Sequence, residues 1–177
     1  MRRLVEAAVL SAAILSPAVA QEATISPDVA RAAFIDPDGN SIGTATIQET
    51  PHGLLIQGKV ANLPAGPHGF HVHETGTCDA EGGFQSAGGH YAPGDNDHGF
   101  MIDEGPHAGD MANQTVGADG TMVFEVFNEN LRLTEGDAAV LDDDGSAIVI
   151  HATADDYRSQ PSGNSGDRIA CAVIEQP

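Results

Sequence analysis

The chain contains few basic residues. Lys and Arg together number 7 among 177 residues, against 26 Asp and Glu, which gives a formal net charge of −19. Nucleic acids and anionic membranes repel such a surface, so we expect neither as a partner. Acidic chains can be disordered, but here 41% of the residues are hydrophobic and many alternate with polar ones. The composition and length therefore indicate one folded domain with a sizeable core.

The sequence also lacks an apolar run long enough to span a bilayer. Its most apolar stretch, Met1–Ala20, is too short and too interrupted. This stretch has a basic start at Arg2 and Arg3 and ends in Ala18–Val19–Ala20, a pattern typical of a secretory signal peptide. We therefore expect a signal peptide at 1–20, a single domain at 21–177 and a periplasmic or otherwise extracytoplasmic location. The alternative is an amphipathic N-terminal helix of the mature fold.

Cysteine is scarce as well. The only two cysteines are Cys78 and Cys171. In an exported chain they predict a single disulfide, and the loop it closes is long enough for the chain-entropy model to credit it with about 4–5 kcal/mol. The alternative is a free, buried pair of thiols.

Long segments with a 3.6-residue hydrophobic period are absent. The chain consists instead of short alternating or apolar segments separated by turns rich in Gly, Pro and Asp, which predicts about eight antiparallel strands in a sandwich or barrel. The segments expected as strands are Val29–Ile35, Ile42–Ile47, Leu54–Val60, Gly69–His73, Ala112–Val116, Thr121–Phe127, Ala138–Leu141, Ala147–His151 and Ile169–Ile174.

Two stretches, Thr75–Asp110 and Ala152–Asp167, show no strand or helix pattern. Structureless loops longer than about 15 residues are uncommon in compact domains and are often functional. The first loop carries most of the histidines, so we interpret it as a candidate functional loop. Ordering it requires anchors, and the disulfide, a metal site and packing on the strands are the available ones.

Histidines supply the strongest functional signal. His71 and His73 form an H-x-H pair, and both imidazoles lie on one face if the segment is a strand. Such a pair favours Zn, Cu, Fe or Ni. The long loop adds three further histidines and a carboxylate, a donor set that suits a tetrahedral zinc site; these are His90, His98, His107 and Asp110.

Five motifs together resemble the copper/zinc superoxide dismutases, in particular the bacterial periplasmic members. They occur in the family's order and the resemblance extends from Val29 to Ile174; they are Gly69–His73, Ser86–His90, His107–Asp110, Val149–His151 and Gly166–Cys171. The resemblance implies an all-β, eight-stranded antiparallel Greek-key barrel or sandwich with a long metal-binding loop and a second irregular loop near the C-terminus.

The resemblance also assigns roles to individual residues. It implies four copper ligands, His71, His73, His90 and His151, and four zinc ligands, His90, His98, His107 and Asp110. The His90 ring would bridge both metals, and Asp155 would link the copper ligand His71 to the zinc ligand His98. Cys78–Cys171 would be the family's disulfide. Arg168 and His90 would be catalytic, Arg168 by attracting superoxide and His90 by carrying a proton.

The implied function is dismutation of superoxide to O2 and H2O2 by alternate reduction and oxidation of histidine-bound copper. The first alternative is a periplasmic copper- and zinc-binding protein without turnover, and the second is a structural sandwich with vestigial histidines. Superoxide would be the small-molecule partner, and both a monomer and a homodimer remain open. Of the two other histidines, His68 is expected to bond backbone near the copper site and His52 to lie on the surface.

The charge distribution departs from the family pattern. The loop 152–167 has Arg158 as its only base, beside Asp155 and Asp156, and the one lysine, Lys59, lies far away in sequence. Attraction of an anion must therefore depend on Arg168, the metals and Arg158. We expect a weaker loss of rate with added salt than in lysine-rich members.

Overall fold

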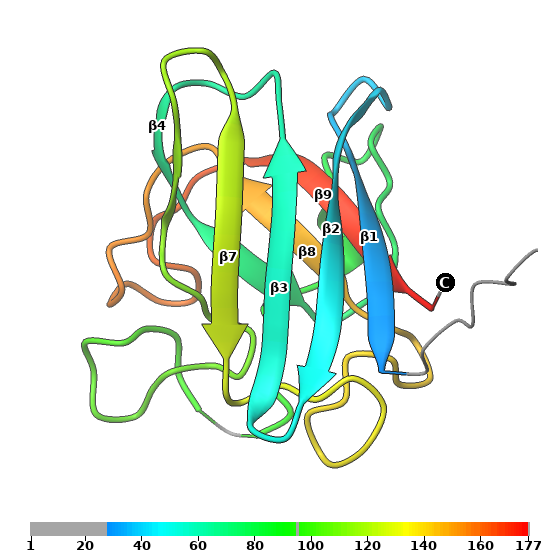
Figure 1. Cartoon of the computed structure of the whole chain (residues 1–177). Coiled ribbons are helices and arrows are strands. Elements are labelled where there is room, and N and C mark those ends of the chain that lie inside the picture. Colours follow the sequence, from blue (N-terminus) through cyan, green and yellow to red (C-terminus); the bar gives the residue numbers. More distant parts are fainter. Residues whose placement is uncertain (1–27, 95, 177) are drawn as a thin grey trace, which may run out of the picture.

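The computed structural model describes residues 28–94 and 96–176, so the expected signal peptide at 1–20 lies outside the described residues. The regular secondary structure of the described part is almost entirely β-strand (Figure 1), with one 3-10 helix at Gln85–Ala87. The strands are β1 Val29–Ile35, β2 Ser41–Thr50, β3 Gly53–Val60, β4 Gly66–His68, β5 Phe70–His73, β6 Gln114–Val116, β7 Met122–Asn128, β8 Ala147–His151 and β9 Arg168–Glu175. Among the described residues, no helix is long and apolar enough to cross a membrane.

Seven strands form one curled antiparallel sheet, and the other two form a small pair. The order in the large sheet is β5-β8-β9-β1-β2-β3-β7, and β4 pairs with β6. Only Gly69 separates β4 from β5, so the chain passes directly from the small pair to one edge of the large sheet. Because β6 leads into β7 at the other edge, the small pair connects the two edges. Counted with β4 and β5 as one bent strand, this is the predicted eight-stranded Greek-key arrangement.

One strand predicted from the sequence does not form, and one short strand was not predicted. Ala138–Leu141 forms no strand and makes a single isolated bridge, between Ala139 and Arg132. Its backbone pairs with its own loop, since Val140 N donates to Arg132 O, while the Val140 side chain is buried in the core. Conversely, Gly66–His68 was not among the segments expected as strands, yet it forms β4. A proline is tolerated there because a two-stranded pair consists of edge strands only.

The core lies between the two halves of the curled sheet. In β1, Ala30, Ala32 and Phe34 are buried and the residues between them are not, which is the alternation expected of a strand with one face on the core. The ring of Phe124 in β7 packs against Phe34 of β1 and Phe70 of β5, at centroid distances of 6.3 and 4.9 Å. Aromatic burial of this kind contributes much of a core's stability.

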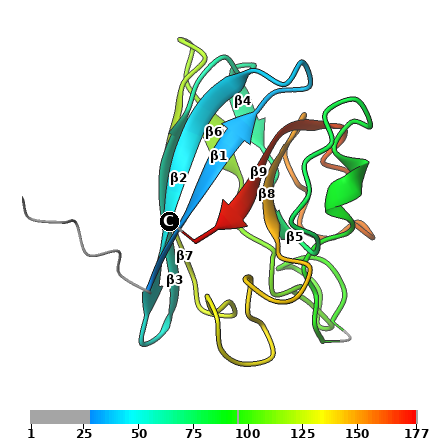
Figure 2. The same ribbon diagram turned by 90° about the vertical axis from the view of Figure 1, so that its right-hand side faces the viewer.

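The two long loops cover the outer face of the half formed by β5, β8 and β9 (Figure 2). The disulfide predicted from the sequence is present between Cys78 in the first loop and Cys171 in β9, at a sequence separation of 93. A small second apolar cluster lies beneath this loop; it consists of Phe84, Ala87, Ala147, Val149 and Cys171. The loop is therefore attached to the sheet both covalently and by packing.

Candidate metal centre

Strand β5 positions the H-x-H pair. Phe70 and Val72 belong to the main core, so His71 and His73 lie on the opposite face, as alternation along a strand requires. That face is covered by the long loops, and the two histidines are 0% and 1% exposed. The same-face prediction is confirmed, and both imidazoles are shielded from bulk water.

Two further histidines complete a group around this pair. His151 ends β8, at an irregularity in the pairing of β8 with β9, and His90 makes an isolated bridge with His73. One ligand atom from each of the four residues lies within 4.8 Å of the others; the residues are His71, His73, His90 and His151. These are the four residues that the family resemblance implies as copper ligands.

Each of three histidines in this group has one ring nitrogen held by the protein. His73 Nδ1 donates to Gly88 O at 3.0 Å, His151 Nδ1 lies 3.3 Å from Gly166 O, and His71 Nε2 is 2.8 Å from Asp155 Oδ2. Such bonds fix the orientation of a metal-binding ring. The other nitrogen of each ring is left for the centre of the group, where His73 Nε2 and His151 Nε2 are 3.3 Å apart.

A second group is centred on Asp110. Its Oδ1 lies 2.8 Å from His90 Nδ1, 2.9 Å from His98 Nδ1 and 3.6 Å from His107 Nδ1. The ligand atoms of all four residues lie within 4.8 Å of one another. Asp110 Oδ2 is oriented by the backbone, because it accepts hydrogen bonds from the N–H groups of Gly99 and His107. Three imidazoles and one carboxylate are a zinc-type donor set.

His90 belongs to both groups, as predicted. Its Nδ1 points to Asp110, while its Nε2 is buried and has no hydrogen-bond partner. The His90 and His71 ring centroids are only 4.0 Å apart. One side chain can thus offer a nitrogen to each group.

Asp155 joins the two groups by a second route. Its Oδ2 accepts from His71 Nε2 at 2.8 Å and its Oδ1 from His98 Nε2 at 3.1 Å. It is 4% exposed. The linking position expected for Asp155 is therefore observed.

Arg168 lies at the start of β9, paired with His151 in β8. Its Nη1 donates to Phe84 O and its Nη2 to Gly88 O, both at 2.7 Å. Gly88 O also accepts from His73 Nδ1, so one loop carbonyl positions both the guanidinium and a ring of the first group. A side chain at Gly88 would collide with Glu74, and its φ of 74° favours glycine.

Burial keeps the first group neutral. It lowers the pKa of His90 to about 4 and that of His151 to about 3, and it lowers the pKa of His73 well below its usual value. It also lowers the pKa of His71, despite the hydrogen bond to Asp155. Neutral imidazoles have the lone pair that a metal ion requires.

In the second group, the carboxylates have the largest influence on the pKa values. Burial opposes the change, but hydrogen bonds to Asp110 and Asp155 raise the pKa of His98 to about 9. Burial alone would raise the pKa of Asp110, yet the close imidazole rings of His107, His90 and His98 hold it far below its usual range. Asp110 therefore stays ionised and provides the negative charge that a divalent cation prefers.

Copper and zinc fit these residues. Three buried ring nitrogens have no hydrogen-bond partner among the described residues, and they are His71 Nδ1, His90 Nε2 and His107 Nδ1. A buried polar atom without a partner costs about 1–3 kcal/mol. All three belong to the two groups, so metal coordination would satisfy the atoms that the protein itself leaves unpaired.

The sequence analysis did not identify two amide side chains that bind the backbone of site residues. Asn113 bonds the backbone of Asp155 through both ends of its amide, at 2.8 and 2.9 Å. Gln160 does the same for His98, at 3.0 and 2.8 Å. Neither residue forms a motif with its partner, because the pairs are 42 and 62 residues apart. No local signal could have identified them.

The other two histidines behave as expected. Buried His68 places Nδ1 2.7 Å from His151 O and Nε2 2.8 Å from Pro64 O, so it bonds backbone beside the first group. His52 is exposed in the turn between β2 and β3.

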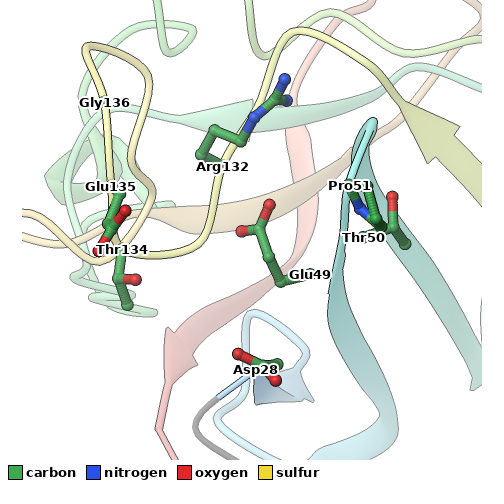
Figure 3. A pocket seen from close by; sticks show the side chains of 8 residues that line it. All are labelled: Asp28, Glu49, Thr50, Pro51, Arg132, Thr134, Glu135 and Gly136. Atoms are coloured by element: carbon green, nitrogen blue, oxygen red, sulfur yellow. The ribbon is translucent and has the colours of Figure 1, made fainter.

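A cavity of about 250 Å³ opens onto the first group and is lined by His73, His90, His151 and Arg168 among others. A second cavity lies elsewhere, between the start of β1, the end of β2 and the loop after β7 (Figure 3). Figure 3 shows carboxylates and Arg132 but no histidine there. Glu49 accepts from Leu133 N and Arg132 donates to Glu129 O, so these charges fasten the loop. The histidine-lined cavity is the functional candidate.

Comparison with known proteins agrees with this geometry. Residues 41–174 match the family model described as copper/zinc superoxide dismutase (SODC). The chain is 42% identical over 139 residues to superoxide dismutase [Cu-Zn] 1 of Aquifex aeolicus, covering 77% of this chain and 82% of that protein. It is 38% identical over 141 residues to superoxide dismutase [Cu-Zn] of Caulobacter vibrioides, covering 78% and 80%.

Solved structures give the same result. A superoxide dismutase-like protein of Bacillus subtilis aligns with a TM-score of 0.77 at 38% identity, over 81% of this chain and 96% of that one. Cu/Zn superoxide dismutase from Brucella abortus aligns with a TM-score of 0.68 at 30% identity, over 83% and 99%. Sequence, fold and metal-ligand geometry agree, and this chain belongs to the copper/zinc superoxide dismutase family.

Proposed function

We propose that this protein converts two superoxide anions and two protons into O2 and H2O2. The observation that carries the proposal is the pair of four-residue ligand groups sharing buried His90, with Arg168 beside the same cavity. The copper ligands would be His71, His73, His90 and His151. The zinc ligands would be His90, His98, His107 and Asp110.

Bound copper would supply one-electron transfer in both directions, while zinc would supply only positive charge and structural order. The protein's own part begins with Arg168. Its guanidinium is charged at every ordinary pH and is held by two carbonyl groups, so it attracts a small anion toward the ring nitrogens of His73 and His151.

His90 is the proposed proton carrier. Among the described residues its buried Nε2 has no hydrogen-bond partner, and His90 is one of the residues that line the cavity. A proton taken up at this atom can be passed to the departing peroxide, which is general acid catalysis by an imidazole. Asp110, bonded to His90 Nδ1, keeps the ring in the orientation that this transfer needs.

Asp155 is a positioning residue in this scheme. By accepting from His71 and His98, it fixes which nitrogen of each ring faces a metal. The orientation of the two groups is thereby coupled.

The test is metal analysis and superoxide turnover of the protein reconstituted with copper and zinc. We expect one copper-type and one zinc-type site per chain. His151→Ala should lose copper binding and turnover. Arg168→Ala should keep both metals and lose about tenfold or more in rate, because it removes the charge that attracts the anion.

A copper- and zinc-binding protein without turnover is the rival function. It predicts full metal occupancy and no activity above that of the His151→Ala variant. Arg168 lines the cavity, and this favours the enzyme, since storage of a cation gains nothing from a guanidinium there.

We also propose that the protein is exported, with cleavage after Ala20. The Cys78–Cys171 disulfide supports an oxidising compartment. Cell fractionation and N-terminal sequencing of the mature protein test this, and a product retaining residues 1–20 in the cytoplasm would contradict it.

A further inference from the structure

The cavity above the first histidine group contains one side chain whose charge opposes the attraction of an anion. Asp167 lines the cavity together with Arg168. An anion that approaches the histidines through this cavity therefore meets a carboxylate as well as a guanidinium. The sequence pattern had drawn attention only to the arginine.

The charge of Asp167 is not neutralised by its neighbour. Arg168 directs Nη1 and Nη2 to the carbonyl oxygens of Phe84 and Gly88. Among the described residues, no ion pair or hydrogen bond engages the Asp167 carboxylate. Asp167 is also exposed, so its charge faces the solvent at the cavity mouth.

The backbone of Asp167 is fixed in place. Its carbonyl oxygen accepts from Ala152 N at 2.7 Å, immediately after His151, and the next residue, Arg168, pairs with His151 in the sheet. The backbone that carries this carboxylate is thus attached to the same strand junction that carries Arg168.

We propose that Asp167 weakens the binding of anions in the cavity and so opposes the attraction exerted by Arg168. This inference rests on the proposed function, because it concerns the approach of superoxide. At a separation of about 6 Å in water, a unit charge changes the local concentration of a monovalent anion about threefold at low ionic strength, and salt screens the effect. The net negative charge of the whole protein also repels anions, but this repulsion is not specific to the cavity.

Azide is the probe for the test, because it is a small monovalent anion that binds copper and changes its optical spectrum. The copper- and zinc-loaded protein is titrated with azide as wild type, Asp167→Asn, Asp167→Ser and Asp167→Glu. Asp38→Asn is the matched control, since it removes one exposed charge from a residue outside the cavity lining. Superoxide turnover is measured for each variant at low and high ionic strength.

We expect Asp167→Asn and Asp167→Ser to bind azide about threefold more tightly than wild type and to gain a similar factor in rate at low salt. Both gains should shrink at high salt. Asp167→Glu and Asp38→Asn should match the wild type. Equal azide affinity in Asp167→Asn and Asp38→Asn overturns the inference. Absence of turnover in the wild type overturns the proposed function instead, and the azide titration still decides the role of Asp167.

Discussion

The two halves of this barrel are each stabilised in a different way. The half formed by β1, β2, β3 and β7 is joined by long, regular pairing, with eight registered pairs between β2 and β3 and seven between β3 and β7. The half formed by β5, β8 and β9 contains the two shortest strands of the large sheet, β5 and β8, and its outer face is covered by two loops that contain little regular structure. The first half is a regular hydrogen-bonded scaffold, whereas the second is also held by attachments of its loops.

The loop half has attachments of several kinds. They include one disulfide, a small apolar cluster and hydrogen bonds that converge on Asp110 and Asp155. Several ring nitrogens remain unpaired in it. The comparison shows that the metal ligands lie in the half with the least regular backbone pairing. In that half, metal binding and the disulfide supply the stabilisation that strand pairing does not.

Removal of both metals should have the largest effect, and it should be confined to one half. We expect amide hydrogens in 75–110 to exchange at least about 10³-fold faster in the chelated protein, because a metal site contributes a large binding free energy to the ordering of its ligands. Amides in β2 and β3 should change little. Hydrogen exchange with mass spectrometry measures both, and uniform protection in the metal-free protein would contradict the comparison.

Loss of the disulfide should have the next largest effect. Cys78→Ala with Cys171→Ala should lower the free energy of unfolding by about 4–5 kcal/mol, since the bridge closes a long loop of the unfolded chain. Denaturant unfolding measures this value. Chemical reduction of the wild type is the control, and a loss below about 1 kcal/mol in both would show that packing alone holds the first loop.

Truncation of the core tests the scaffold half. Phe34→Ala should lower the free energy of unfolding by about 3–5 kcal/mol, because Phe34 is fully buried and its removal leaves a cavity beside Phe124. Zinc affinity of the folded variant should stay near that of wild type, since the ligands lie on the other half. A parallel loss of zinc affinity would show that the halves are not separable.

A single methyl group in the second loop should have the smallest effect on stability but a clear effect on metal binding. A Cβ at Gly163 would lie 1.8 Å from Asp155 Oδ1 and 2.8 Å from His98 Nε2. Gly163→Ala should therefore displace Asp155 and weaken metal affinity about 10- to 100-fold. Competition with a chelator measures the affinity.

Gly39→Ala is the control for that prediction. Gly39 also has a positive φ, of 80°, but nothing lies within 4 Å of its Cβ position. It shares the backbone strain and lacks the collision. Equal metal affinity in the two variants would mean that Gly163 does not act through Asp155.

The fold class and most of the candidate site could be predicted from the sequence. Strand alternation and Gly, Pro and Asp turns are local signals, and so is the H-x-H spacing of His71 and His73. The one strand predicted wrongly, Ala138–Leu141, was apolar because Val140 enters the core from a loop. A run of apolar residues indicates that the segment is buried, but it does not show that the backbone forms a strand.

The sequence by itself determined which donor atoms are available, their order along the chain and the alternation that puts two of them on one strand face. Only the tertiary structure decided which of them meet. Asp155 reaches His71 across 84 residues, Asn113 holds Asp155 from 42 residues away, and Asp167 turns out to share a cavity with three histidines. Such contacts are set by the closure of the sheet and the attachment of the loops, and no local pattern encodes them.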